Sequence, residues 1–150
     1  MFCVTDAHDL ADILVAAHAL TRVAALETRN EAPSAQWRTL GILVSRGPMR
    51  IGDLAKQSRV TQPGVTRLIG GMAQQGLVER EADPDDTRAV RVALTDRGRR
   101  AYFSWREQLA EALLPRFAEL DEAEWQTLRS AARILTSRIT AADETKENEQ

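Results

Sequence analysis

Apolar residues recur every three or four positions along most of the chain, a spacing that predicts a mainly helical protein. The first such stripe lies in residues 8–28, and the helix that it predicts ends before Pro33. A second helix is predicted from about Ala35 to Ser45, with Ser34 as its N-cap and a stop at Gly47 and Pro48. The positions of the first stripe that need an apolar partner are Leu10, Ile13, Leu14 and Ala17.

Two short helices with a tight turn between them follow, which is the layout of a helix-turn-helix. The first covers residues 51–58, Arg59 and Val60 form the turn, and the second runs from Thr61 to about Gln75. Thr61 is predicted to cap this second helix, and Pro63 lies in its first turn, where a missing N–H costs nothing. The positions expected to face the core are Val65, Leu68, Ile69 and Met72.

The outward face of this second helix, near its N-terminal end, consists of Gln62, Gly64, Thr66 and Arg67. A recognition helix presents such polar side chains to base edges and phosphates in a DNA major groove. A plain amphipathic surface helix is the alternative if this helix is considered alone.

A β-hairpin is predicted after Gly76, which is placed to end the second helix. Residues 77–81 and 89–94 alternate as strands do, and residues 82–88 form a long polar tip. In the second strand Arg91 faces outward, while the core-facing positions are Val90, Val92 and Leu94. The pattern therefore predicts a mainly α, winged helix-turn-helix fold of the α+β kind, with a wing of two strands.

Two long helices complete the chain. Thr95 is predicted to cap a helix from Asp96 to about Leu120, which Pro115 kinks. The last helix starts near Asp121, and its apolar positions follow a spacing of 3, 4, 3 and 4, as in the seam of a coiled coil. These positions are Trp125, Leu128, Ala132, Leu135 and Ile139. Residues 141–150 are polar and without period, so a frayed tail is expected there.

The net charge of −2 conceals a strong segregation along the chain. Residues 1–36 carry −3, residues 37–100 carry +5 and residues 101–150 carry −4. A positive middle between negative ends is typical of a protein that presents one surface to a polyanion. An ordinary solvated mixture of charges is the alternative interpretation.

Length and composition favour one domain, since 150 residues with 43% apolar side chains supply a single core. No run approaches the roughly 18 apolar residues of a membrane-spanning helix. Acidic residues also occupy the first 20 positions, where a signal peptide would carry positive charge. We therefore expect a cytoplasmic protein without a membrane partner.

Three segments resemble the multiple antibiotic resistance regulator (MarR) family of winged-helix repressors. They are residues 62–69 (QPGVTRLI), residues 75–80 (QGLVER) and residues 86–98 (DTRAVRVALTDRG). The third is the most specific, because the family wing reads Asp-x-Arg, a strand, Leu-Thr and a Gly three residues on. The matching positions are Asp86, Arg88, Leu94, Thr95 and Gly98. The resemblance covers roughly residues 8–140 and is strongest over residues 37–98.

The resemblance implies a single domain with a DNA-binding lobe over about residues 35–100 and dimerisation helices over about 8–30 and 101–140. Family members bind pseudo-palindromic operators in double-stranded DNA as homodimers. Many release the DNA when a phenolic or other small molecule fills a pocket near the junction of the dimerisation and DNA-binding regions. The expected function is therefore that of a ligand-responsive repressor.

The resemblance also assigns roles in DNA binding. It implies that the outward set Gln62, Gly64, Thr66 and Arg67 reads the major groove, and that Arg88 enters a minor groove, steadied by Asp86. The strong negative potential of a narrow minor groove attracts an arginine independently of any family likeness. Further candidates, which are phosphate contacts or solvated charges, are Arg80, Arg91 and Arg97. Gly64, Gly70 and Gly71 depart from expectation, because glycine weakens a helix that should be stiff.

Two other classes of function, an enzyme and a protein-interaction module, fit the sequence less well. The sequence has no Gly-rich phosphate loop, nucleophile motif or cluster of metal ligands, so we predict that the protein is not an enzyme and needs no metal or cofactor. A winged helix that has lost DNA binding and binds another protein is the second alternative. The basic middle and the intact Arg88 argue against it.

The sequence offers several candidate residues for an effector site but does not identify the effector. Trp37, Tyr102 and Trp105 could line a cavity for an aromatic ligand, although core packing is the favoured interpretation. His8 and His18 could join a metal or ligand pocket, but two histidines ten residues apart on a helix do not share a face well. They are therefore interpreted as polar partners at a subunit interface. Cys3 could sense peroxide or thiols, but an idle thiol is favoured because no activating base is visible.

Overall fold

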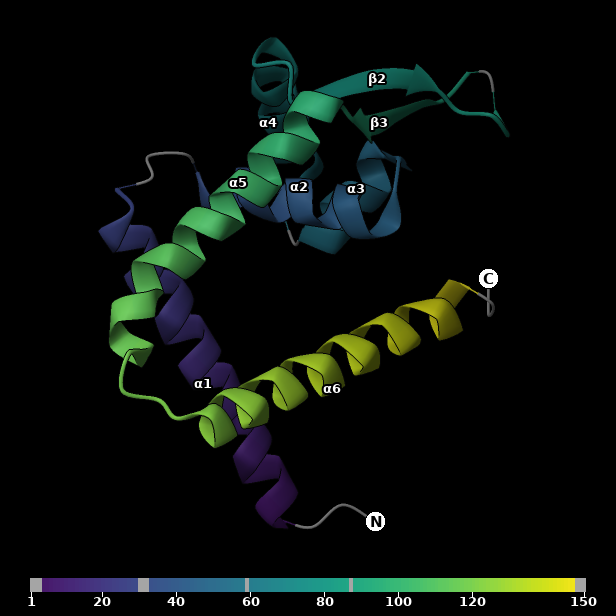
Figure 1. Ribbon diagram of the computed structural model, residues 1–150. Helices are drawn as coiled ribbons and strands as arrows, with labels where there is room; N and C mark the ends of the chain where they lie inside the picture. The colour runs from purple at the N-terminus through teal and green to yellow at the C-terminus, as the bar shows by residue number, and fades with distance from the viewer. Residues whose placement is uncertain (1–3, 30–32, 59, 87, 148–150) are drawn as a thin grey trace. The chain divides into compact units, whose positions relative to one another are not determined.

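The structure is a computed structural model that describes residues 4–29, 33–58, 60–86 and 88–147 (Figure 1). It divides into two compact units, residues 1–113 and residues 114–150. The first unit contains α1 (Val4–Glu27), α2 (Ser34–Arg46), β1 (Met49–Arg50), α3 (Ile51–Ser58), α4 (Gln62–Gln74), β2 (Val78–Ala82), β3 (Val90–Leu94) and α5 (Asp96–Leu113). The second unit contains a 3-10 helix, Leu114–Phe117, and α6 (Glu122–Glu147). This arrangement confirms the predicted winged helix-turn-helix fold.

The sheet differs from the prediction, because it has a third strand among the described residues. All its pairings are antiparallel and its order is β1-β3-β2, so β3 lies in the middle. Val92 of β3 is opposite Met49 on one side and Arg80 on the other. The strand β1 has two residues, which is too short to show the alternation by which strands are found in a sequence.

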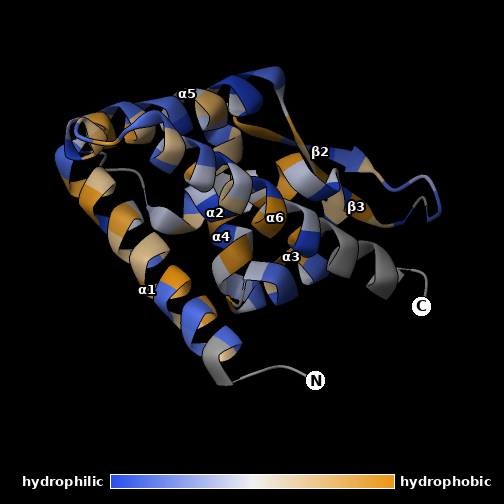
Figure 2. Ribbon diagram, turned by 60° about the horizontal axis from the view of Figure 1, so that its bottom comes forward, coloured by the Kyte–Doolittle hydropathy of each residue, from blue (hydrophilic) through white to orange (hydrophobic). Residues whose placement is uncertain are grey.

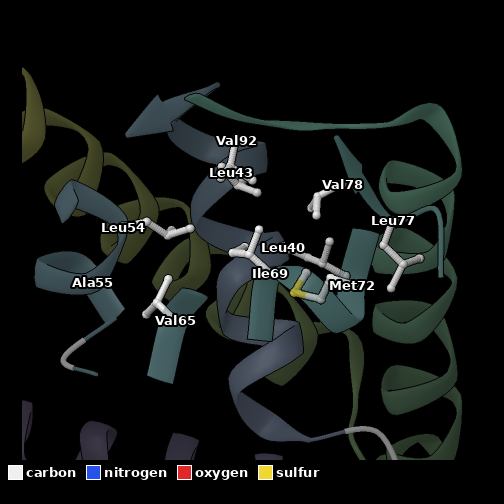
Figure 3. Close-up of a cluster of buried hydrophobic side chains, with 10 residues drawn as sticks. All are labelled: Leu40, Leu43, Leu54, Ala55, Val65, Ile69, Met72, Leu77, Val78 and Val92. Atoms are coloured by element: carbon white, nitrogen blue, oxygen red, sulfur yellow. The ribbon is translucent and has the colours of Figure 1, made fainter. Parts of the chain in front are cut away.

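The core of the first unit lies where α2, α3 and α4 meet the sheet (Figure 3). Leu40 and Leu43 come from α2, Leu54 from α3, and Val92 from β3, and all four are buried. The residues of α4 that complete the core are Val65, Ile69 and Met72, each with no exposed surface. Burial of a side chain of this size stabilises a fold by roughly 1.5–3 kcal/mol, so α4 is held firmly against the lobe.

Two predictions at helix starts have different outcomes. Ser34 is not an N-cap, because α2 begins at Ser34 itself and Pro33 occupies the capping position with φ −56°. Proline fixes φ near that value and is therefore already prepared to start a helix. In the second unit, α6 begins at Glu122, which agrees with the predicted start near Asp121. Asp121 and Glu124 cap this start reciprocally: each backbone N–H donates to the other's carboxylate, at 2.9 and 2.8 Å.

Two predictions at helix ends are wrong. The helix α5 ends at Leu113 rather than near Leu120, and Pro115 lies in the 3-10 turn that follows, because proline cannot donate the next helical hydrogen bond. The frayed tail predicted over residues 141–150 is helical as far as Glu147, since α6 continues through it. Alanine, glutamate and lysine in this stretch are strong helix formers. Residues 148–150 lie outside the described residues.

Within the first unit, α1 packs along α5, which also contacts α2. Hydrophobic residues nevertheless recur along α1 (Figure 2), and the exposed ones include Leu10, Ile13, Leu14 and Val15. In the second unit, Phe117 contacts Trp125 with ring centroids 6.1 Å apart, while other apolar residues of α6 are exposed. Among the described residues, no helix has both the length and the apolar character needed to cross a membrane.

Candidate DNA interface

The helix α4 has a well-defined start and a rigid inner face. The Gly64 N–H donates to Thr61 Oγ1 at 3.4 Å, and Pro63 lies in the first turn, as predicted. Gly76 follows the helix with φ +68°, a left-handed conformation that glycine adopts without strain. These local signals, together with the buried inner face, set which side of α4 points outward.

The predicted reading face of α4 is exposed, with one exception. Gln62, Thr66 and Arg67 are exposed, and together with Pro63 they line one open hollow. Gly64 instead packs inward, because a Cβ at this position would lie 2.9 Å from Val60 Cγ1 and 3.1 Å from Thr61 Oγ1. The structure therefore gives Gly64 a packing role in the helix-turn-helix turn, and three exposed side chains remain in the predicted reading face.

The pair Gly70 and Gly71 does not interrupt α4, which continues through both residues to Gln74. A Cβ at either position would meet nothing within 4 Å. Close packing, which could have explained these glycines, is therefore not their reason. Nothing in the structure explains their presence.

The wing tip is ordered by a carboxylate, but not in the way predicted. Asp86 Oδ1 accepts a hydrogen bond from the backbone N–H of Arg88 at 3.0 Å, and the Asp86 carbonyl accepts one from the Ala89 N–H at 2.8 Å. Asp86 therefore holds the turn that carries Arg88, rather than its guanidinium. The Arg88 side chain is exposed at the tip.

The other candidate arginines of the wing are not equivalent. Arg91 Nη2 donates to Glu81 Oε1 at 2.6 Å, and the two residues lie directly opposite each other on β3 and β2. This pairing leaves the Arg91 side chain 27% exposed, so it is a cross-strand partner first. Arg80 is exposed on β2, and Arg97 is exposed in the first turn of α5. Both are available to a phosphate.

The sequence interpretation missed an ion pair at the base of the wing. Arg50 Nε on β1 donates to Asp83 Oδ2 at 2.7 Å, and the Asp83 side chain is only 5% exposed. The hydrogen bonds from Arg50 and from the backbone N–H of Asp85 hold the pKa of Asp83 below its ordinary value, against the opposing effect of burial. The only local signal was a short Asp-Pro-Asp-Asp run, which resembled a solvated tip.

A cavity of about 730 Å³ lies between α1, α2 and α5, all within the first unit. Its wall includes Trp37, Tyr102 and Trp105, with the two tryptophan rings stacked 4.7 Å apart at an angle of 3°. Trp37 and Tyr102 also pack against the core, so these aromatic residues serve as both core and cavity wall. His18, which was interpreted as an interface residue, lines the same cavity, as does Arg38.

Two other candidate sites from the sequence have no support in the described part of the chain. Cys3 lies outside the described residues, so its redox role stays untested. Within the described residues, no three side chains of His, Cys, Asp or Glu are grouped as metal ligands would be.

Comparison with known proteins identifies the family. Residues 33–90 match the model of the MarR family. An HTH-type transcriptional regulator of Mycobacterium tuberculosis is 32% identical over 136 residues, which are 90% of this chain and 95% of that protein. The homoprotocatechuate degradative operon repressor of Escherichia coli is 31% identical over 84 residues, 56% of this chain and 57% of the repressor. A MarR family protein of Bacillus stearothermophilus has the same fold, with a TM-score of 0.70 and 21% identity over 93% of this chain and 99% of that one. The chain described here belongs to the MarR family of transcriptional regulators.

Proposed function

We propose that the protein is a sequence-specific regulator that binds double-stranded DNA as a homodimer, on a pseudo-palindromic operator. The helix α4 enters the major groove, and the wing places Arg88 in the minor groove. The observation that carries this proposal is the exposed set Gln62, Thr66 and Arg67 on a helix whose opposite face is locked into the core. A rigid helix with polar side chains near its N-terminus is the element that reads base edges in this class of fold.

Exposed apolar surface on the flanking helices supports the homodimer. Leu14 on α1 is 70% exposed and Ile139 on α6 is 66% exposed, and each belongs to a predicted apolar stripe. Leu10, Ile13 and Leu128 are exposed as well. Contiguous exposed apolar residues mark an interaction surface more often than a solvated one. A second copy of this chain is the proposed partner.

The name of one relative and the cavity support ligand-responsive repression. The Escherichia coli relative is named as the repressor of a degradative operon for homoprotocatechuate, an aromatic compound. In this chain, the cavity between α1, α2 and α5 is lined by three aromatic side chains. We propose that an aromatic small molecule binds there and weakens DNA binding, and that the protein needs no metal and catalyses no reaction.

The test of DNA binding is fluorescence anisotropy with labelled duplexes from the intergenic DNA beside the gene and with random duplexes, over about 50 to 200 mM salt. We expect one dimer per site, with at least about a thousandfold preference for one duplex. Arg67→Ala should cost about 1–3 kcal/mol of operator affinity and relax base preference. Arg88→Ala should weaken binding with less change in preference.

A matched control is Arg129→Ala, because Arg129 is an exposed arginine of α6 that pairs with Glu122. This substitution also removes one positive charge, but outside the proposed DNA interface, and it should leave operator affinity unchanged. If wild-type protein that is folded and dimeric binds no duplex at low salt, the proposal is wrong and a protein-interaction module replaces it.

The effector is tested separately. Calorimetric titration with 4-hydroxybenzoate, a phenolic probe, should give one site per chain, and the same compound should release the operator. Trp105→Leu removes the stacking partner of Trp37 and should weaken the binding of the probe while DNA binding stays intact. Unchanged binding of the probe by this variant would place its site elsewhere.

A further inference from the structure

The wing depends on a buried acid at the point where β2 ends. Asp83 directly follows Ala82, the last residue of β2, and is 4% exposed. Its two carboxylate oxygens are both used: Oδ2 accepts from Arg50 Nε at 2.7 Å and Oδ1 accepts from the Asp85 N–H at 2.9 Å. The Asp83 N–H also donates to the Ala89 carbonyl at 3.1 Å, which closes the base of the tip. Asp83 is therefore the fixed point from which the tip extends.

The partner of this acid comes from outside the wing. Arg50 lies on β1, and β1 pairs with β3 rather than with β2. The hydrogen bond from Arg50 to Asp83 therefore crosses the sheet: it joins β1, one edge strand, to the residue that follows β2, the other edge strand. A buried carboxylate that loses its cation is strongly unfavourable, so removal of the Arg50 charge should displace Asp83 from this position.

Arg50 also lies close to the reading helix. It lines an open hollow together with Lys56 of α3 and Gln62, the first residue of α4. The side chain of Arg50 is 47% exposed, whereas that of Asp83 is 5% exposed. Arg50 thus pairs with the base of the wing and lines one hollow with the start of α4, and these are the two elements proposed to meet adjacent grooves of one duplex.

We propose that Arg50 is a positioning residue for the wing: through Asp83 it fixes the direction in which the tip carries Arg88, and so adds to operator affinity without reading a base. This inference rests on the proposed binding of DNA by α4 and the wing. A direct contact between Arg50 and a phosphate is the competing explanation, because half of the guanidinium side chain is exposed. The two explanations predict different results when Asp83 is changed.

The test combines variants at both ends of the pair with Arg88→Ala, and it measures affinity for the operator. Arg50→Met keeps the apolar stem and removes the charge, while Asp83→Asn keeps the shape of the side chain and leaves the Arg50 charge free. If Arg50 positions the wing, Arg88→Ala should cost about tenfold in the wild type and no more than about threefold in either background. If Arg50 is a phosphate contact, Asp83→Asn should bind as tightly as the wild type or more tightly.

Two controls separate this effect from simple damage to the fold. Glu81→Gln removes a carboxylate from the same wing, one that pairs with Arg91 and is 38% exposed, and Arg88→Ala should keep its full cost in that background. Hydrogen exchange of the Asp83 and Asp85 amides, which donate to the Ala89 carbonyl and to Asp83 Oδ1, should accelerate in Arg50→Met, while amides of α4 keep their protection. This pattern would show that the wing tip loses its fixed position while the rest of the lobe stays folded.

The outcomes distinguish this inference from the proposal on which it rests. If the wild type binds no duplex, both fail. If the wild type binds its operator and Arg88→Ala costs the same factor in every background, Arg50 does not position the wing, and only this inference is overturned. Tight binding by Asp83→Asn overturns it as well.

Discussion

Gly98 lies in the first turn of α5, where a Cβ atom would have less room than at any other described glycine. Thr95 Oγ1 accepts from the Gly98 N–H at 2.9 Å and donates to the Gly76 carbonyl at 2.7 Å. The Thr95 N–H donates to the Leu77 carbonyl at 3.2 Å. Thr95 thus joins the end of α4 to the start of α5, and Gly98 lies against this junction. We expect Gly98→Ala to destabilise the protein.

The size of the effect follows from what a Cβ would meet. At Gly98 it would overlap the Leu77 carbonyl oxygen and lie 2.9 Å from the carbonyl carbon and 3.1 Å from Leu94 Cδ1. Backbone atoms cannot rotate away as a flexible side chain does, so α5 has to shift. Overpacking of this kind costs about 1–3 kcal/mol, and two weakened hydrogen bonds at Thr95 cost about 1 kcal/mol each. The helix propensity of alanine returns about 1 kcal/mol. The net loss is roughly 2–4 kcal/mol.

The assay is urea unfolding followed by circular dichroism at one fixed protein concentration, because the proposed dimer would unfold in a concentration-dependent way. Thermal unfolding of Gly98→Ala should shift down by roughly 5–15 °C. Gly70→Ala is the matched control: a Cβ there meets nothing within 4 Å, so stability should rise by up to about 1 kcal/mol. If both variants were equally stable, the junction would be looser than the contacts indicate, and the reasoning would be refuted.

Three further predictions concern the acid of the wing, the dimer and the turn. Because the folded pKa of Asp83 is lowered, the stability that its charge contributes is complete above the ordinary value of 3.8 and is lost as the pH falls through the folded pKa. The difference in free energy of unfolding between wild type and Asp83→Asn should therefore shrink only below about pH 3.8. In analytical ultracentrifugation, Leu14→Glu should weaken the dimer, whereas Val15→Glu, equally exposed at 70% but about 100° around the helix, should not. Gly64→Ala should lower stability by about 1 kcal/mol by crowding Val60, and unchanged urea unfolding would contradict the packing role.

Local signals in the sequence were enough to predict most of the fold. Thr61 and Thr95 cap the helices that they were expected to cap, and Gly76 adopts the left-handed conformation expected after α4. Each of these features depends on residues three or four positions apart, so a single sequence carries the information. The Leu-Thr and Gly of the family motif also gain a physical reason, because Thr95 and Gly98 form the junction between α4 and α5.

Features that depend on distant residues were not predictable in the same way. Arg50 and Asp83 are 33 positions apart, and their pairing requires β1, a strand of two residues. The order β1-β3-β2 brings the two together, and no spacing along the chain encodes that order. The exposure of Gln62, Thr66 and Arg67 on α4 and of Arg88 at the wing tip followed from local patterns and agrees with the structure.

Asp83 and Asp86 illustrate why residue type alone does not predict the roles of carboxylates in the wing. Both belong to one acidic run, yet Asp83 is nearly buried and crosses to β1, while Asp86 is exposed and caps a local turn. Two ion pairs also reduce the positive charge of the lobe at the sheet. Asp83 pairs with Arg50, and Glu81 pairs with Arg91. Arg67 on α4 and Arg88 at the tip remain exposed. Since exposed cations dominate the field that a polyanion meets, Arg67 and Arg88 contribute positive potential on the helix and the tip proposed to enter the two grooves, beside the exposed Arg80 and Arg97.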